Sequence, residues 1–281
     1  MKRSTKIWLI AAGALIALGL IVFAVVMALS KWDFTKLSDV TLETNTYEIS
    51  ESFTDINIDC EVADISVMPS EDGACRVVCS EDEDAKHSVS VKDGVLTVTA
   101  AQEKAWHENI HLIGSSTKIT VCLPEAELNT VKICSTTGGI TVKGIKADEL
   151  KLSATTGSIT LSDSSCGSLS VCNETGGITI KDVKSASLVS KGSTGSTVLK
   201  NVIVGGKAEI ERSTGDIELY RCDAESLDLE TDTGDITATL LSGKDFDADS
   251  STGDVSVPDG SSGGKCRVRT GTGSIDIKLV K

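Results

Sequence analysis

Residues 131–180 read VKICSTTGGITVKGIKADELKLSATTGSITLSDSSCGSLSVCNETGGITI. Thr-Gly pairs mark this stretch at a constant spacing, and the same mark continues towards the end of the chain. The glycines of the pairs are Gly138, Gly157, Gly176, Gly195, Gly215, Gly234, Gly253 and Gly273, at intervals of 19 or 20 residues. Self-similarity at a fixed period is the sequence signature of a repeat fold.

Apolar residues recur at fixed positions on both sides of each Thr-Gly pair. Two residues after the glycines stand Ile140, Ile159, Ile178, Thr197, Ile217, Ile236, Val255 and Ile275. Five residues before them stand Ile133, Leu152, Val171, Ser190, Ile210, Leu229, Ala248 and Val268. The alternation around these positions predicts two short strands per repeat, one on each side of a turn.

The arrangement of these strands follows from what they must bury. Stacking the repeats at the ~4.8 Å strand spacing turns every apolar column into an inward ladder. We therefore predict an all-β fold, a β-solenoid with 19 or 20 residues per coil. A meander of antiparallel hairpins is the alternative, and the chirality of parallel crossovers predicts a right-handed coil. Cys266 falls in one apolar column, and Cys222 in another with Ile145, Val183, Val202 and Leu241.

Residues 51–125 also alternate between apolar and polar residues, but off the period. We predict that they form an N-terminal β cap on a solenoid of residues 126–281, because a bare solenoid end would expose unpaired strand edges. Lys92-Asp93-Gly94 is a hairpin-turn signal within this cap.

The N-terminus carries an uncharged apolar run over residues 7–29, IWLIAAGALIALGLIVFAVVMAL. A helix of this length crosses a ~30 Å hydrocarbon core at ~1.5 Å per residue. Lys2, Arg3 and Lys6 precede the run, which predicts a cytoplasmic N-terminus and an extracytoplasmic C-terminal domain. Residues 1–30 thus form a cytoplasmic stub and a single-pass anchor in the cell membrane, and residues 31–50 a linker. A cleaved signal peptide is the alternative, although its apolar region is usually ~7–15 residues long.

The charge of the chain excludes one class of partner. All 41 acidic side chains lie beyond residue 30, but only 24 of the 27 basic ones do, because Lys2, Arg3 and Lys6 precede the apolar run. Such an acidic domain disfavours nucleic acid and anionic lipid as partners.

The nine cysteines cannot all pair internally, because their number is odd. Cys75 and Cys79 share a strand face but stand ~13 Å apart in an extended chain, too far for a disulfide. The sequence contains no C-x-x-C pair, so a zinc or thiol-redox site has little support from it. We expect most of these thiols to be small buried hydrophobes.

Aspartate follows the glycine in three consecutive repeats, as Asp216, Asp235 and Asp254. Stacked ~4.8 Å apart, the three carboxylates form a row that could hold Ca²⁺, a cation that takes about six to eight oxygen ligands. Ordinary turn chemistry is the alternative. Paired carboxylates could also cleave a glycosidic bond, but the sequence offers no groove of aromatic rings for a sugar.

A second group of metal-ligand residue types is formed by Glu103, His107, Glu108 and His111. These residues share a face if the segment is helical, and a solvated loop is the alternative. The sequence has neither a phosphate-binding loop nor a nucleophile elbow, so we predict no enzyme and no cofactor other than the Ca²⁺ considered above.

Several segments resemble a known family: ADISVMPSEDG (63–73), DGVLTVTA (93–100), ITVCLPEAELNTVKI (119–133) and the turns TTGGITV, TTGSITL and STGDIEL. Over about residues 51–281 the chain resembles the bacterial putative-adhesin family, domains of unknown function with β-strand repeats. The resemblance implies a β-solenoid on the bacterial surface, usually behind one membrane span, and it supplies no catalytic residues.

These observations lead to three functional hypotheses. The favoured one is an adhesin-like surface interaction or scaffold module, held in the membrane by residues 7–29 and facing an unknown surface ligand or envelope protein. The second is an accessory or sensor of envelope-stress signalling. The third is a carbohydrate-active enzyme on a β-solenoid.

Overall fold

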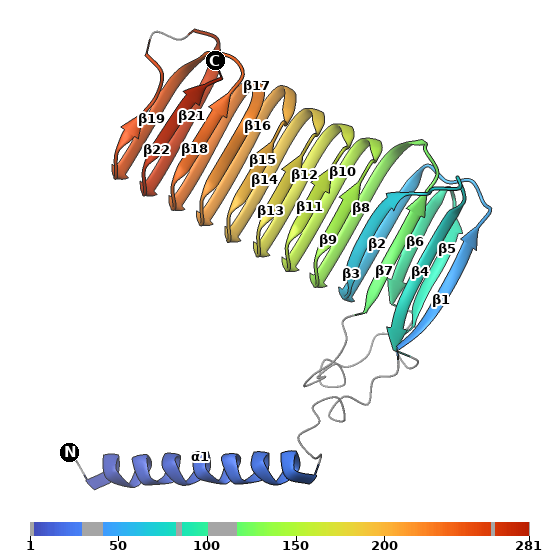
Figure 1. Ribbon diagram of the computed structural model, residues 1–281, viewed down its shortest axis with the longest axis vertical. Helices are drawn as coiled ribbons and strands as arrows, with labels where there is room; N and C mark the ends of the chain where they lie inside the picture. The colour runs from blue at the N-terminus through green and yellow to red at the C-terminus, as the bar shows by residue number, and fades with distance from the viewer. Residues whose placement is uncertain (1–2, 30–41, 83–85, 101–116, 260–261, 281) are drawn as a thin grey trace. The chain divides into compact units, whose positions relative to one another are not determined.

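The computed structural model describes residues 3–29, 42–82, 86–100, 117–259 and 262–280. The chain divides into two units. In the first unit the structure describes one helix, α1 (Arg3–Leu29), and all the described strands belong to the second (Figure 1). Residues Ala12–Leu29 of α1 are long and apolar enough to cross a membrane, although a signal sequence at this position would have the same features. The helix matches the apolar run in the sequence.

The second unit is a β-solenoid, which confirms the predicted fold class (Figure 1). Its coils each contribute one strand to sheet A and one to sheet B. The coil strands that join sheet B are β2 (Asp55–Val62), β8 (Glu127–Thr137), β10 (Lys146–Thr156), β12 (Ser165–Thr175), β14 (Lys184–Thr194), β16 (Ile203–Thr214), β19 (Lys244–Thr252) and β21 (Gly264–Thr272). Those that join sheet A are β3 (Asp64–Pro69), β9 (Ile140–Lys143), β11 (Ile159–Ser162), β13 (Ile178–Lys181), β15 (Thr197–Lys200), β18 (Ile236–Leu240), β20 (Val255–Ser256) and β22 (Ile275–Leu279). The long strand β17 (Ile217–Thr233) passes from sheet A into sheet B.

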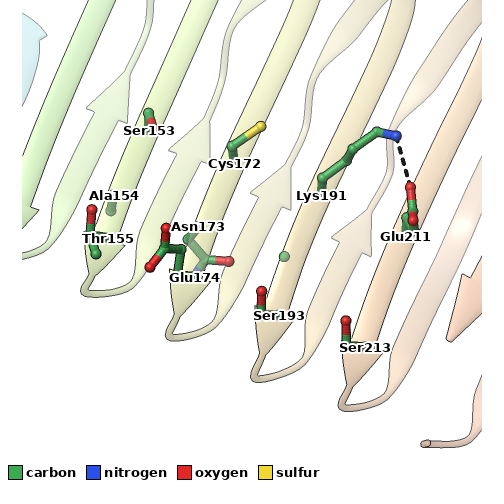
Figure 2. Close-up of a pocket in the computed structure, with 11 residues that line it drawn as sticks. Ser153, Ala154, Thr155, Cys172, Asn173, Glu174, Lys191, Ser193, Glu211 and Ser213 are labelled. Atoms are coloured by element: carbon green, nitrogen blue, oxygen red, sulfur yellow. Dashed lines mark hydrogen bonds and ion pairs between the residues drawn. The ribbon is translucent and has the colours of Figure 1, made fainter. Parts of the chain in front are cut away.

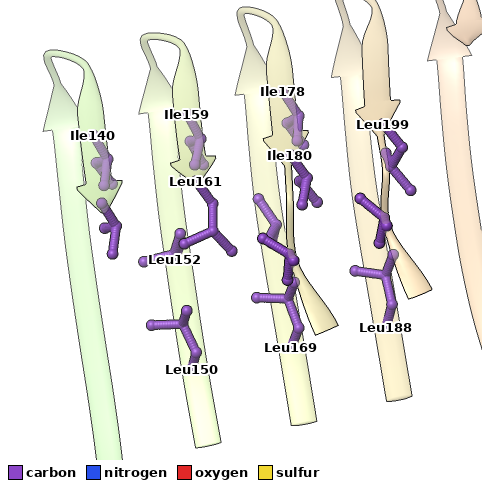
Figure 3. Packing of buried hydrophobic residues seen from close by; sticks show 14 of the residues in the cluster. Ile140, Leu150, Leu152, Ile159, Leu161, Leu169, Ile178, Ile180, Leu188 and Leu199 are labelled. Carbon is purple, nitrogen blue, oxygen red and sulfur yellow. The ribbon is translucent and has the colours of Figure 1, made fainter. Parts of the chain in front are cut away.

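Parallel, in-register pairing joins the coils. Ile159 pairs with Ile140 on one side and with Ile178 on the other, and the next strands continue the same register. The apolar columns of the sequence therefore become ladders in the space between the two sheets (Figure 3). This parallel pairing excludes the meander of antiparallel hairpins. One column differs from its prediction: after a register shift in β17, Leu240 rather than Leu241 pairs with Cys222, and Leu241 is exposed.

The Thr-Gly turns stack directly on one another, and this stacking explains their glycines. Gly195 has a φ of +119°, and a Cβ built on it would lie 2.3 Å from the carbonyl oxygen of Gly176. Its N–H donates to the carbonyl oxygen of Thr214 in the following coil at 2.9 Å. Only glycine combines this backbone conformation with so close an approach of two chains. The regular Thr-Gly spacing is therefore required by coil stacking.

The last two repeats do not stack in sequence order. β17 pairs with β21 rather than with β19, and β18 pairs with β22, so the final repeat lies inside and the preceding repeat forms the outer edge (Figure 1). The residues of the two repeats suit these positions. Cys266 and Val268 of β21 are fully buried, whereas Phe246 and Ala248 of β19 are only partly buried. Strand β19 also alternates with aspartates, which suit a solvent-exposed edge.

The opposite end of the solenoid is covered by five further strands: β1 (Leu42–Ile49), β4 (Cys75–Asp82), β5 (His87–Lys92), β6 (Val95–Ala100) and β7 (Lys118–Leu123). We call these five strands the cap. In sheet A, β1, β4 and β7 pair antiparallel, and β7 continues the sheet onto β3. In sheet B, β5 and β6 form the predicted hairpin, which turns at Asp93 and Gly94 with positive φ.

Two parts of this end differ from their predicted ranges. Strands β2 and β3 lie within residues 51–125, yet they form a coil of the stack, inserted between the cap and the β8–β9 coil. Ala63 stands in the place of the turn glycine: its N–H donates to the carbonyl oxygen of Thr137 at 3.0 Å, as that of Gly138 does to Thr156 at 2.9 Å. Strand β1 lies within the range predicted as a linker, where it pairs with β4 along its whole length.

Candidate functional site

The aspartates predicted as a cation row lie in the stacked Thr-Gly turns. Asp216 and Asp235 occupy adjacent coils, and Asp216 Oδ1 accepts the backbone N–H of Asp235 at 2.9 Å. Asp235 Oδ1 in turn accepts the N–H of Ser274 at 2.7 Å. Each carboxylate thus stabilises the turn of the next coil.

Asp254 does not continue this row, because of the order of the last two repeats. Strand β22 pairs with both β18 and β20, so Ser274 stands between Asp235 and Asp254. The expectation of three stacked aspartates is therefore wrong for its third member. The structure brings together only Asp216 and Asp235, and Ca²⁺ binding there stays a prediction.

Asp64 has the same role at the other end of the solenoid, and sequence reasoning missed it. Its Oδ1 accepts the N–H of Gly139 at 2.8 Å. The residue lies directly after Ala63, the position equivalent to a turn glycine, so its role could have been found by extending the repeat alignment to a coil without the Thr-Gly mark.

The other predicted metal-ligand group, Glu103, His107, Glu108 and His111, lies outside the described residues.

A groove of about 330 Å³ crosses β10, β12, β14 and β16 on sheet B, close to the turns (Figure 2). Thr155, Glu174, Ser193 and Ser213 come one from each strand and line it. A charged pair closes one side, where Lys191 Nζ lies 2.8 Å from Glu211 Oε2. Hydrogen bonds to Glu211 and to Glu209 raise the pKa of Lys191 above its ordinary range. The groove is therefore polar and spans four coils.

The interior of the solenoid contains a column of residues, three before the turn glycines, in which several side chains are polar. Thr231 Oγ1 donates to the carbonyl oxygen of Gly215 at 3.0 Å, and Thr270 Oγ1 donates to that of Gly234 at 2.9 Å. These inward hydroxyls satisfy glycine carbonyl oxygens of the neighbouring coil, so the turn is hydrogen-bonded from inside as well as along the stack.

Arg212 occupies this column as a buried cation, with 2% of its surface exposed. Its Nε donates to Thr197 Oγ1 at 2.6 Å, and its Nη1 donates to Asn173 Oδ1 at 2.8 Å. The guanidinium fits because Gly192 supplies no side chain: a Cβ there would lie 1.7 Å from Nη1. Burial lowers the pKa of Arg212 to about 10. Within the described residues Arg212 forms no ion pair, so only neutral oxygens stabilise its charge.

The cap contains a second buried polar group, formed by Cys79 and Glu81 of β4 and by His87 of β5. Glu81 is fully buried and His87 is 9% exposed. Glu81 Oε2 lies 2.7 Å from His87 Nδ1 and accepts the backbone N–H of His87 at 2.7 Å. Its other oxygen, Oε1, accepts from Asn45 Nδ2 at 2.9 Å. We call Cys79, Glu81 and His87 the cap cluster.

Burial governs the chemistry of the thiols. It raises the pKa of Cys79 to about 12, with a further contribution from the charge of Glu81. Burial also raises the pKa of Tyr47, whose hydroxyl donates to the carbonyl oxygen of His87 at 3.4 Å. All nine cysteines are free thiols in the structure, and five of them, including Cys222 and Cys266, are buried. These five fit the expectation of small buried hydrophobes.

Fold and turns together define the class of this protein: a β-solenoid with stacked Thr-Gly turns, in a chain that also carries an apolar N-terminal helix. Residues 53–281 match the model of the Toastrack DUF4097 family, and the chain belongs to that family. The family match confirms the resemblance found in the sequence. Among curated proteins, none matches the chain.

Three solved structures are similar to the chain at low sequence identity. A putative adhesin from Bacteroides fragilis is 18% identical, with a TM-score of 0.49 over 85% of this chain and 97% of its own. A putative lipid binding protein from Parabacteroides distasonis is also 18% identical, with a TM-score of 0.40 over the same shares. A putative cell adhesion protein from Clostridium sporogenes is 15% identical, with a TM-score of 0.32 over 85% of this chain and 100% of its own.

Proposed function

We propose that this chain is a membrane-anchored, extracytoplasmic interaction or scaffold module that has no enzymatic activity and binds its partner through the outer face of the solenoid. The observation that carries this proposal is the groove on sheet B, where side chains from four coils line one continuous polar surface (Figure 2).

The groove has the chemistry of a recognition surface for an extended polar partner. Thr155, Ser193 and Ser213 offer hydroxyls that both donate and accept hydrogen bonds. Lys191 and Glu211 add charges of both signs. Because the coils are held in register by backbone hydrogen bonds, these groups keep fixed spacings, which lowers the entropic cost of binding. An envelope polysaccharide or an extended peptide fits this pattern.

The side of the membrane on which we place the solenoid is inferred from α1. The basic residues Lys2, Arg3 and Lys6 precede its apolar segment, which favours a cytoplasmic N-terminus and an exported solenoid. The acidic balance beyond residue 30 suits a soluble, exported domain. A protease added to spheroplasts, in which the cell membrane is intact but the outer layers are removed, is expected to digest the solenoid. Digestion only after lysis would contradict this orientation.

The groove is tested by a bulky substitution on its surface. We expect Ser193→Trp to reduce the adherence of cells to polysaccharide-coated surfaces as much as deletion of the chain does. Thr179→Trp, on sheet A, is the matched control and should leave adherence unchanged. If deletion leaves adherence intact but alters the response to wall-active antibiotics, the envelope-stress hypothesis replaces this one.

A further inference from the structure

The cap cluster brings together three different kinds of metal-ligand side chain. The Sγ of Cys79, a carboxylate oxygen of Glu81 and a ring nitrogen of His87 all lie within 4.8 Å of one another, and all three residues are buried. Among the described histidines, cysteines, aspartates and glutamates, no other group comes this close together. The three side chains approach from both sheets, since β4 belongs to sheet A and β5 to sheet B.

We propose that Cys79, Glu81 and His87 form a binding site for one Zn²⁺ ion in the cap. Thiolate, imidazole and carboxylate are the ligands that zinc takes in proteins. Ca²⁺ and Mg²⁺ prefer shells of oxygen ligands and fit this donor set poorly. Three protein ligands leave the fourth position of a tetrahedral shell to a ligand from solvent.

The hydrogen bonds of the cap cluster show how the ion is accommodated. Without metal, a proton lies between His87 Nδ1 and Glu81 Oε2, which are 2.7 Å apart. Zn²⁺ takes the place of this proton, and the Cys79 thiol also loses its proton to become a ligand, so binding releases protons. The bond from Asn45 to Glu81 Oε1 fixes the carboxylate, as outer-shell partners do at metal sites.

The placement of the cluster suggests what the metal does for the protein. A zinc ion held by Cys79 and Glu81 on one sheet and by His87 on the other ties sheets A and B together at the end of the solenoid. A ligand that binds only the folded state raises the stability of that state. The proposed site is therefore a structural metal site that stabilises the cap. Its role does not depend on ligand binding at the groove on sheet B.

The test uses the full-length chain purified in detergent. Titration with Co²⁺ is expected to give a thiolate-to-metal charge-transfer absorption that saturates at one equivalent, and Zn²⁺ should displace the Co²⁺ and raise the melting temperature by a few degrees. Cys79→Ser should abolish the absorption and the shift, and His87→Gln should weaken metal binding at least ~10-fold. Cys266→Ser removes a buried thiol from the solenoid core and should leave metal binding unchanged.

The proposal is overturned if the wild-type chain binds no metal, or if Cys79→Ser retains the charge-transfer absorption. Metal binding that survives in Cys79→Ser but is lost in His107→Gln/His111→Gln would also overturn it, because the site would then lie in the other metal-ligand group. X-ray absorption on the zinc-loaded wild-type chain needs no variant to fold. It should show one sulfur at about 2.3 Å with nitrogen or oxygen at about 2.0–2.2 Å, and a shell without sulfur would rule the site out.

Discussion

Glu81 in the cap and Arg212 in the solenoid are both buried charged side chains, and they are stabilised in different ways. In the cap, the carboxylate of Glu81 is paired with an ionisable partner, His87. In the solenoid, the guanidinium of Arg212 is bonded only to neutral oxygens, in space left by Gly192. A charge held by neutral acceptors has no partner that can change its protonation state. In the zinc site proposed for the cap cluster, the metal replaces protons. The Arg212 site offers no such exchange, because the guanidinium is itself the cation.

The largest effect is expected from breaking the pair in the cap. Glu81→Ala leaves His87 and Asn45 without their buried acceptor, and removing one member of a buried pair typically costs about 4 kcal/mol. Urea unfolding of the full chain, followed by circular dichroism, measures this loss. Glu125→Ala removes an exposed partner of Lys146 and should unfold close to the wild type. An equal loss in both variants would show that the burial of Glu81 is not the cause.

A somewhat smaller loss is expected at the Arg212 site. Gly192→Ala places a methyl group where Nη1 of Arg212 lies, so the guanidinium must leave Asn173. We expect a loss of about 3 kcal/mol, from overpacking and from the disrupted buried hydrogen bonds. In Gly205→Ala the new Cβ would meet its nearest atoms at 3.8 Å, an ordinary contact, which makes it the matched control.

A double substitution separates the two causes of that loss. If the displaced guanidinium dominates, Gly192→Ala should cost much less in an Arg212→Met background than in the wild type, with a coupling of about 1–3 kcal/mol. Strict additivity of the two substitutions would contradict the role assigned to Gly192.

Alkaline pH should weaken the solenoid through its buried thiols. Burial raises the pKa of Cys266 to about 12 and that of Cys222 to about 11, from an ordinary value of 9.0. The unfolded chain therefore ionises these thiols at lower pH than the folded chain does, so their contribution is intact below pH ~9 and is lost as pH rises towards 11–12. The loss approaches about 1.4 kcal/mol per pH unit for each thiol.

Urea unfolding at pH 8 and pH 10 measures this dependence, and Cys266→Ala should show a shallower fall in stability than the wild type. The lowered pKa of Arg212 works in the opposite direction but only above its folded value of about 10, outside that range. An unchanged slope in Cys266→Ala would mean that this thiol is not protected from ionisation by the fold.

The smallest effect is expected on the surface of the groove. Lys191 pairs with Glu209 and Glu211, but its side chain is 47% exposed. Solvent and salt screen such pairs, so Lys191→Ala should cost less than about 1 kcal/mol, and the difference from the wild type should shrink at 1 M NaCl. A loss of stability as large as that of Gly192→Ala would indicate that the ion pairs of Lys191 with Glu209 and Glu211 support the fold.

Much of the fold could be predicted from the sequence because its constraints are local and repeated. The turn glycines recur at the stacking period, and the apolar columns around them state which side of each strand faces inward. The order of the last two repeats could not be read from that period, since any order of similar coils satisfies it. The polarity of Asp245, Asp247 and Asp249 was the available signal that β19 lies at the edge.

The buried polar sites were missed for a related reason. Each depends on residues that become neighbours only when the two sheets face each other or when coils stack. Cys79 and Glu81 share one strand face, but nothing local indicates that His87 comes from the opposite sheet to meet them. At the Arg212 site, a glycine and a charged residue occupy the same inward column in successive repeats. Gly192 and Arg212 are both unusual residues for this column, and they stand in adjacent repeats. Their adjacency was the available signal that the missing side chain of one makes room for the large side chain of the other.

The interior position of the final repeat constrains the order in which the solenoid can be completed. When the coils form in chain order, each coil up to β17 can pair with the one already formed. β19 arrives before the strand that will separate it from β17. The final arrangement therefore requires the edge of β17 to stay free until residues 264–279 are available, and this last repeat completes the solenoid by pairing between β17 and β19.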